Sequence, residues 1–437
     1  MVQIEAFKGL RYELGHVGAL SDVIAPPYDV ICPELQDELY KNHPANVIRL
    51  ILNRDEPGDE TGDEKYARAA RALKQWQRDG VMQLETYPAI YVYHQQFEYA
   101  GQTFVRRGFM TRMKLEKLGD GNVYPHEETH SAAKADRLKL FNATKANLSQ
   151  IFGIYPDEAN QAQTLLENSI QGVTAIEATD HLGVLHRLWP VYDSKIIGEL
   201  TEAMNPRPMF IADGHHRYET AYNYREQLDC QGLLTANHPA QSVLTMCVSM
   251  HDAGMIVLPT HRLFEGVAQY DSASLIQRLQ GCFDVSTAGT GPAQAAAVWE
   301  QIELEDQQGM LGLYCPVDDT WVVANLNDTG RTKMAEIASD QSSDWQGLGV
   351  SLLHRLIMDT LLDEVDLPKP TYVHQVEEVV EELATDQDTN KFGLAALVMP
   401  ATLDHIKAIS EHGERMPAKS TYFYPKLLSG LVINPLA

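Results

Sequence analysis

The apolar positions of this chain change their spacing along the sequence, and each spacing predicts a different element. Over residues 66–76 an apolar side chain recurs at every third or fourth position, which is the pattern of an amphipathic helix. Over residues 90–97 and 103–110 apolar and polar side chains alternate, which predicts two strands. The Ala100-Gly101 pair between them predicts a hairpin turn.

A strand, a tight turn and a helix are predicted within the short stretch 208–220. An apolar run ends at Asp213-Gly214, and a helical pattern begins at once with His215, His216 and Arg217. We expect Asp213 to be the N-cap, and Gly214 to let a ligand approach the backbone closely. The first turn of a helix presents N–H groups without intrahelical partners and the positive end of the dipole. The stretch is therefore suited to a phosphate group, although a capped helix with exposed histidines is the plainer alternative.

The remaining pattern indicates a mixed fold. Apolar runs at 46–52 and 150–155 predict strands, and 346–362 predicts a buried helix. Beyond residue 264 helical and strand patterns alternate, so we predict a motif-bearing region over 1–264 and an α/β region over 265–437 that contributes the Gly413–Lys426 loop. The fold class predicted for the whole chain is α+β. No glycine-rich signature of a Rossmann or P-loop nucleotide site is present.

Composition narrows the class of partner. The formal net charge of −25 makes the chain repel a phosphate backbone, so we expect no nucleic-acid partner. No apolar run approaches the roughly 18 residues of a membrane span, and no membrane partner is expected. The five cysteines are scattered and include no C-x-x-C pair, which indicates a reducing, cytoplasmic location.

Residues 126–130, His-Glu-Glu-Thr-His, match the H-E-x-x-H pattern of zinc peptidases. Pro125 places His126 in the first turn of a predicted helix, and no third zinc ligand follows His130. We favour a carboxylate at Glu127 or Glu128 that acts as a general base or metal ligand. An acidic first turn stabilised by the helix dipole is the second interpretation, and a zinc site is the third.

Four side chains are predicted to bind a small anionic substrate, within a wider basic and polar set that includes Lys426 and is expected to line an anionic pocket. Lys134 and Arg137 lie in the helical segment after Glu127, Lys419 lies in the C-terminal loop, and Tyr28 follows the stiff Pro26-Pro27 pair. Tyr28 is expected at a pocket rim. Each of these side chains has a plainer alternative, which is an exposed charge or a surface turn.

Several long motifs together resemble those of a bacterial and archaeal family called domain of unknown function 1015. The motifs are Pro26-Pro27-Tyr28-Asp29-Val30-Ile31, His126-Glu127-x-Thr129, Asp136-Arg137-Leu138, Asp213-Gly214-His215-His216-Arg217-Tyr218-Glu219-Thr220, Leu258-Pro259-Thr260-His261-Arg262 and the ending Gly413–Lys426. The resemblance covers nearly the whole chain. It implies no activity, because the family name records none.

The Asp-Gly-His-His-Arg motif after a strand also resembles the phosphate-binding motif of the ParB/sulfiredoxin-like superfamily, which includes the ADP-dependent free-serine kinase. This resemblance implies a ParB/sulfiredoxin-like core with insertions. It also implies that Glu127 is the base toward a serine hydroxyl. The catalytic cysteine of sulfiredoxin has no counterpart, because His215 and His216 stand in its place.

Three functions remain open at this point. In the first, a small-molecule kinase uses ADP or ATP, with the phosphates on residues 213–217 and the moving charge neutralised by His215, His216 and Arg217. Mg²⁺ is expected, with Asp213 or Glu128 as its ligand. In the second, the same pocket is a non-catalytic module that binds a nucleotide or phosphometabolite. In the third, His126 and His130 form a zinc hydrolase.

Overall fold

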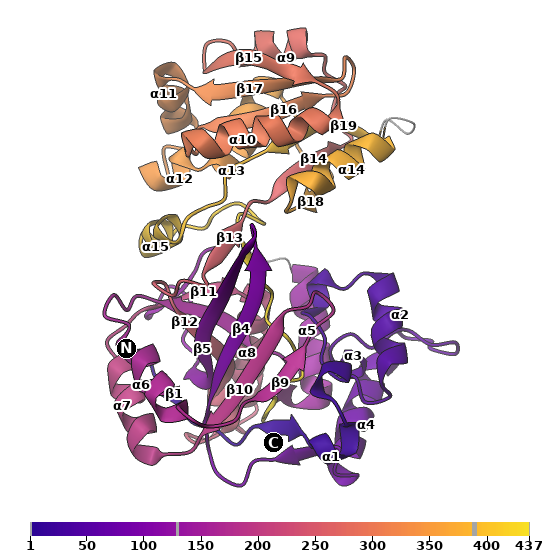
Figure 1. Ribbon diagram of the computed structural model, residues 1–437, viewed down its shortest axis with the longest axis vertical. Helices are drawn as coiled ribbons and strands as arrows, with labels where there is room; N and C mark the ends of the chain where they lie inside the picture. The colour runs from indigo at the N-terminus through magenta and orange to yellow at the C-terminus, as the bar shows by residue number, and fades with distance from the viewer. Residues whose placement is uncertain (1, 128–130, 387–390, 437) are drawn as a thin grey trace. The chain divides into compact units, whose positions relative to one another are not determined.

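The chain forms two compact units in the computed structural model, which describes residues 2–127, 131–386 and 391–436 (Figure 1). The first unit comprises residues 1–125, 129–255 and 425–437, and the second comprises 126–128 and 256–424. The chain therefore leaves the first unit after residue 255 and returns to it at Pro425. The sequence pattern contains no signal for this return.

The first unit is built on a nine-stranded mixed sheet. The order is β6-β11-β8-β12-β5-β4-β10-β9, and β1 pairs with β5 beside this path. Two neighbouring pairs, β11 with β6 and β12 with β8, are parallel, and the other pairs are antiparallel. The strands of the sheet are β1 Ile4–Glu5, β4 Ile90–Tyr99, β5 Gln102–Lys114, β6 Val123–Pro125, β8 Ile151–Tyr155, β9 Ile176–Thr179, β10 Leu185–Val191, β11 Met209–Asp213 and β12 Ser242–Ser249.

The predicted hairpin is confirmed as the long pair β4 and β5 (Figure 1). Ala100 and Gly101 make its turn with positive φ angles of 49° and 72°. Val92, Phe109 and Val243 from three adjacent strands enter one apolar core, which stabilises the centre of the sheet. Two small ribbons complete the strands of this unit, β2 Leu10–Tyr12 with β3 Met82–Leu84 and β7 Ala146–Asn147 with β21 Asn434–Pro435.

The amphipathic helix predicted over residues 66–76 is confirmed as α4, Glu64–Arg78. Among the helices of the first unit, α5 packs against both α4 and α8. Their bounds are α1 Leu14–Val17, α2 Pro33–Asn42, α3 Ile48–Ile51, α4 Glu64–Arg78, α5 Ser131–Thr144, α6 Gln161–Ile170, α7 Ser194–Met204 and α8 His215–Cys230, with short 3₁₀ turns η1 Leu20–Asp22, η2 Tyr28–Val30 and η3 Pro239–Gln241. None of the described helices in either unit is both long and apolar enough to span a bilayer.

The strand predicted at 46–52 is wrong, because this segment contains helix α3. Asn46 is fully buried, and its side-chain oxygen accepts a hydrogen bond from Ile48 N at 2.9 Å. Its amide nitrogen donates to Asp22 O at 2.8 Å and to Ile24 O at 3.1 Å. A short apolar run is compatible with a buried helix and with a buried strand, so the sequence pattern does not distinguish the two. Here the segment is helical, and Asn46 ties it to residues distant in the sequence.

The second unit contains a six-stranded sheet in the order β15-β17-β16-β19-β14-β18, with its own apolar core. Its strands are β14 His261–Glu265, β15 Phe283–Thr290, β16 Met310–Cys315, β17 Thr320–Leu326, β18 Thr371–Val373 and β19 Phe392–Leu397, and a separate ribbon pairs β13 Ile256–Leu258 with β20 Tyr422–Tyr424. Its helices are α9 Ser272–Leu279, α10 Ala295–Glu305, α11 Asp328–Ile337, α12 Ser343–Gly347, α13 Gly349–Ser351, η5 Leu352–Leu362, α14 Val376–Asp386 and α15 Leu403–Glu411, with a 3₁₀ turn η4 Pro292–Gln294.

Two details of the second unit differ from the sequence prediction. Every strand pair described in its sheet is antiparallel, so the region is α+β rather than α/β. Alternating helix and strand patterns do not by themselves fix the direction of pairing. The single helix predicted at 346–362 is divided into α12, α13 and the π-type helix η5. For the chain as a whole, the mixed sheet of the first unit and the helices confirm the predicted α+β class.

Residues 425–437 are bound to the first unit through backbone pairing at several points. Ala25 and Ser429 exchange backbone hydrogen bonds, as do Leu10 and Ile433. Further along, β21 pairs with β7, and Asn434 Nδ2 donates to Asn147 Oδ1 at 2.7 Å. We call residues 425–436 the C-terminal segment. It is therefore an integral part of the first unit.

Candidate functional site

The predicted strand, turn and helix at 208–220 are confirmed as β11, Gly214 and α8. The N-cap is Gly214 and not Asp213, because Asp213 still belongs to the strand. Gly214 has φ of +89°, which an L side chain rarely adopts. A Cβ atom there would also lie 3.0 Å from the guanidinium of Arg217. The turn therefore requires glycine for its backbone angle, and Arg217 would have to shift to admit a side chain there.

Helix α8 is fixed at its first turn by a buried tyrosine. Tyr218 is fully buried, and its hydroxyl donates to Glu116 O at 2.8 Å and accepts from Glu116 N at 2.9 Å. Ala221 continues the same buried face into the core. His215 is buried and His216 is half-buried. The N-terminal turn of α8 is therefore held in place before any ligand binds.

Two basic side chains flank the carboxylate at the end of β11. Lys426 Nζ lies 3.1 Å from Asp213 Oδ2, and Arg217 Nη2 lies 3.6 Å from Asp213 Oδ1. Arg217 also donates a hydrogen bond from Nη1 to the backbone oxygen of Gln150. The side chains of Arg217, Asp213 and Lys426 are 14%, 20% and 15% exposed. We call these three side chains with the first turn of α8 the anion cluster.

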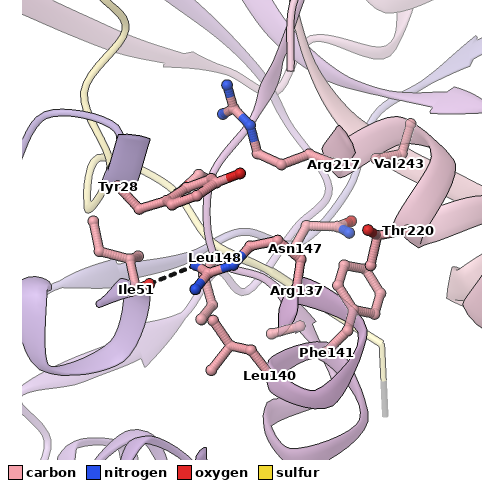
Figure 2. A pocket seen from close by; sticks show the side chains of 12 residues that line it. Tyr28, Ile51, Arg137, Leu140, Phe141, Asn147, Leu148, Arg217, Thr220 and Val243 are labelled. Carbon is pink, nitrogen blue, oxygen red and sulfur yellow. Dashed lines mark hydrogen bonds between the residues drawn. The ribbon is translucent and has the colours of Figure 1, made fainter. Parts of the chain in front are cut away.

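A cavity of about 50 Å³ adjoins Arg217 in the first unit (Figure 2). Most of the surface that lines it is apolar, while the polar groups come from Tyr28, Arg137, Asn147, Ser149, Arg217 and Thr220. In Figure 2 the ring of Tyr28 lies between the guanidinium groups of Arg137 and Arg217. The complete lining is Tyr28, Ile51, Arg137, Leu140, Phe141, Ala146, Asn147, Leu148, Ser149, Arg217, Thr220 and Val243.

Tyr28 and Arg137 form one wall of this cavity. The guanidinium carbon of Arg137 lies 4.1 Å from the centre of the Tyr28 ring, at cation–π distance. Arg137 also donates to Ile51 O at 2.7 Å and to the carboxylate of Asp136. Burial raises the pKa of Tyr28, as does the charge of Asp29, while the charges of Arg137 and Arg217 oppose that rise. Tyr28 is therefore an uncharged wall at neutral pH. The same two side chains also line a neighbouring cavity of about 150 Å³ with Asn53, Lys65 and Tyr66.

Thr220 lines the cavity one helical turn beyond Arg217. Its side chain is 1% exposed, and its hydroxyl oxygen has no hydrogen-bond partner among the described residues. A buried hydroxyl without a partner costs about 1–3 kcal/mol of folding free energy. The cavity that Thr220 lines is where a polar atom of a ligand would have to lie to become that partner.

Thr220→Val is therefore expected to raise the free energy of unfolding by about 1 kcal/mol, because the isosteric methyl group needs no partner. The same variant is expected to bind the ligand of the cavity more weakly. Urea denaturation measures the first effect and calorimetric titration with ADP the second. A lower free energy of unfolding than in the unsubstituted protein would show that the hydroxyl is already satisfied.

Lys134, the remaining substrate-binding prediction in this unit, lies on α5. Its Nζ is 2.7 Å from Glu219 Oε2 on α8, with the two side chains 28% and 19% exposed. The pair joins α5 to α8 near the anion cluster. The positive charge of Lys134 is therefore balanced by the carboxylate of Glu219 in this structure.

Glu127 and His126 belong to the second unit, where they form an extended segment rather than a helix. Glu127 and Met416 form an isolated parallel β-bridge, in which Met416 N donates to His126 O at 2.8 Å. The helix predicted to begin at His126 is therefore wrong, since α5 begins at Ser131. His130 lies outside the described residues, so the one-turn spacing that a zinc peptidase needs between His126 and His130 stays a prediction.

The local surroundings of Glu127 are polar and ordered. Thr421 Oγ1 donates to Glu127 Oε1 at 3.2 Å, and Thr421 N lies 3.4 Å from the same oxygen. His126 is fully buried, with Nε2 2.9 Å from Thr421 Oγ1. The Glu127 side chain is 17% exposed. Its carboxylate is thus oriented by Thr421 and still reaches solvent.

Lys419 lies in the same unit and has φ of +58°. Its backbone oxygen accepts a hydrogen bond from Arg262 Nη2 at 2.9 Å. Arg262 is almost fully buried, and burial lowers its pKa to about 10. The C-terminal loop is therefore fixed through its backbone at Lys419.

The predicted metal ligands remain a prediction. Glu128 and His130 lie outside the described residues. Within the described ranges no three His, Cys, Asp or Glu side chains gather as a metal-binding group. Asp213 has a lysine ammonium group at 3.1 Å in this structure. Mg²⁺ in phosphate-transfer sites takes most of its ligands from water and phosphate, so one carboxylate is enough for a binding role.

The predicted site residues do not include Thr220, and the sequence places Lys426 only within the wider basic and polar set expected to line an anionic pocket. Lys426 was recognisable only as one of several basic residues near the end of the chain, and its neighbour Asp213 lies 213 positions away. Thr220 belongs to the long motif after Asp213, but a threonine on a helix carries no signal of an unpartnered hydroxyl. Tyr28, Arg137 and Arg217 were predicted, and the structure brings all three to one cavity.

The match to a family model settles the relationship of the chain. The model described as "Protein of unknown function (DUF1015)" matches residues 4–351, well over half of the sequence. The chain belongs to the DUF1015 family. The family predicted from the motifs is therefore confirmed. A search of curated proteins finds no match to this DUF1015 chain.

Solved structures show only distant likenesses. A conserved hypothetical protein from Pyrococcus furiosus is 13% identical, with a TM-score of 0.32, over 70% of this chain and 89% of that one. A free serine kinase in complex with AMP is 10% identical, with a TM-score of 0.32, over 71% and 92%. SbnI with a C-terminal truncation, from Staphylococcus aureus, is 12% identical, with a TM-score of 0.34, over 75% and 87%. At these scores the likenesses assign neither a fold nor an activity.

Proposed function

We propose that this protein is a small-molecule kinase that binds ADP or ATP at the anion cluster and transfers a phosphoryl group to an alcohol such as free serine. The observation that carries the proposal is the turn at Gly214, where the first turn of α8 and the guanidinium of Arg217 meet beside a cavity. This combination provides backbone donors, a helix dipole and a planar cation for phosphate oxygens.

Each part of the transfer has a proposed residue. Phosphate oxygens rest on the first turn of α8, and Arg217, His215 and His216 compensate the charge that develops on the moving phosphoryl group. Mg²⁺ is proposed to bridge the phosphates, with Asp213 or Glu128 as a protein ligand. Arg137 and Tyr28 in the cavity wall, with Lys134 and Lys419, are proposed to hold the substrate.

Glu127 is proposed to accept the proton of the alcohol. As the proton leaves, the alcohol oxygen bonds to the phosphorus, and the bond between the phosphorus and the nucleotide oxygen breaks. This role is supported by the hydrogen bond from Thr421, which orients the carboxylate, and by its partial exposure. The resemblance of the sequence motif to that of the ParB/sulfiredoxin-like superfamily implies the same role for Glu127. The assignment rests on this chemistry and on the local geometry of the second unit.

The direct test is to incubate the purified protein with ADP or ATP, Mg²⁺ and a panel of amino alcohols and hydroxy acids, and to follow the products by phosphorus NMR. We expect a phosphorylated product with at least one acceptor, and none when the acceptor is omitted. Nucleotide binding without product from any acceptor supports instead a non-catalytic module that binds a nucleotide or phosphometabolite. Absence of both binding and product contradicts the proposal.

A further inference from the structure

The C-terminal segment brings Lys426 to the anion cluster through a backbone that is held at three carbonyl groups. Gln95 Nε2 donates to Lys426 O at 3.0 Å, and Arg106 donates to Pro425 O. Gln150 Nε2 donates to Leu428 O at 2.9 Å. Lys426 thus sits on a fixed peptide and not on a loose chain end.

All three of these anchors are buried polar groups. Arg106 and Gln95 are fully buried, and Arg106 Nε donates to Gln95 Oε1 at 3.1 Å. Burial of a guanidinium group is costly unless its donors are bound, and here they bind Gln95 and the carbonyl beside Lys426. Gln150 connects Arg217 to the C-terminal segment, because its backbone oxygen accepts from Arg217 while its side chain donates to Leu428 O.

The charges of the cluster leave an excess that suits an anion. Asp213 carries one negative charge, and Lys426 and Arg217 lie 3.1 Å and 3.6 Å from its two oxygens. The positive end of the α8 dipole adds to the two cations. The unpartnered Thr220 hydroxyl in the adjoining cavity is a second, independent sign of a ligand.

We infer that Lys426 is a phosphate-binding residue of this site, which reaches the terminal phosphate of a bound nucleoside di- or triphosphate and exchanges part of its contact with Asp213 for that phosphate. The inference rests on the proposed nucleotide-binding function. Arg106, Gln95 and Gln150 act as positioning residues, since they fix the peptide that carries the lysine. The C-terminal segment is therefore a part of the site.

The test compares Lys426→Met with the unsubstituted full chain in calorimetric titrations with ADP, ATP and adenosine. We expect ADP and ATP to bind about tenfold more weakly, which is the effect of one charge-assisted hydrogen bond, and adenosine to bind equally well. Lys426→Arg is expected to recover most of the loss. The matched control is Lys74→Met. Lys74 is exposed on α4, and its substitution removes the same charge from the same unit. An equal loss for adenosine would overturn the inference, because it would indicate a structural role.

A double variant separates direct contact from neutralisation of Asp213. If Lys426 contacts phosphate, Lys426→Met weakens ADP binding in the Asp213→Asn background as well. If it only neutralises Asp213, the substitution has no effect in that background, and the inference is overturned. Melting temperatures of all variants confirm that they are folded.

Inorganic pyrophosphate distinguishes failure of this inference from failure of the proposed function. Should the unsubstituted protein bind pyrophosphate but no nucleotide, the kinase proposal fails while Lys426 is still tested by its effect on pyrophosphate affinity. Should nucleotides bind with no difference for Lys426→Met, the inference alone fails. Binding of neither anion contradicts both.

Discussion

Glu127→Gln is expected to lower phosphoryl-transfer turnover by about 10²–10⁴-fold, the usual contribution of a general base, with nucleotide affinity almost unchanged. The amide keeps an oxygen that accepts the hydrogen bond from Thr421, so the local structure is retained while the proton acceptor is lost. Steady-state turnover with the best acceptor measures the first effect, and calorimetric titration with ADP measures the second.

The control for this variant is Glu305→Gln, at the exposed end of α10 in the same unit. It makes the same chemical change at a side chain outside the predicted site, and we expect turnover to stay as in the unsubstituted protein. A Glu127→Gln variant that retains full turnover would remove Glu127 from the mechanism. A variant that loses affinity and turnover in equal measure would instead indicate a role in binding.

Arg217→Met is expected to weaken binding of ADP and ATP by about 100-fold, which corresponds to loss of a charge-assisted, two-pronged contact to phosphate. The side chain carries the guanidinium that lies over Gly214 and adjoins the cavity. Its removal also leaves the charge of Asp213 balanced by Lys426 alone, so the anion cluster attracts phosphate less strongly. Titration of the variant with ADP at two salt concentrations measures the loss and its electrostatic part.

Arg225→Met is the matched control, because Arg225 lies on the same helix and pairs with Glu226 outside the cavity lining. We expect it to bind ADP with unchanged affinity. Unchanged ADP affinity in Arg217→Met would contradict the proposed phosphate site, since Arg217 is the predicted cation nearest to the turn.

Local patterns were enough to predict the part of the site that is continuous in sequence. The apolar run before Asp213, the glycine and the helical spacing after it predict β11, the turn and α8. The one local error is the cap, since Gly214 takes the N-cap position in a left-handed conformation. Aspartate is a common N-cap, and the pattern alone does not show that the strand pairing extends through Asp213.

Segments whose conformation depends on distant partners were not predictable in this way. The run 46–52 is helical, and Asn46 in it is tied to two carbonyl groups more than 20 positions earlier in the sequence. His126 is extended, and its backbone oxygen accepts a hydrogen bond from Met416. Propensity and spacing describe neighbours along the chain, and neither contains these contacts.

The C-terminal segment has a consequence for how the protein is made. Residues 425–436 pair with elements near the N-terminus, at Leu10, Ala25 and β7, yet they leave the ribosome only after all of residues 256–424. At translation rates of about 5–20 residues per second, the nascent first unit waits on the order of ten seconds or more for these partners. During that interval the edges that they later cover are open to chaperones, and a polypeptide that stops before residue 425 contains the second unit but leaves the first unit unfinished.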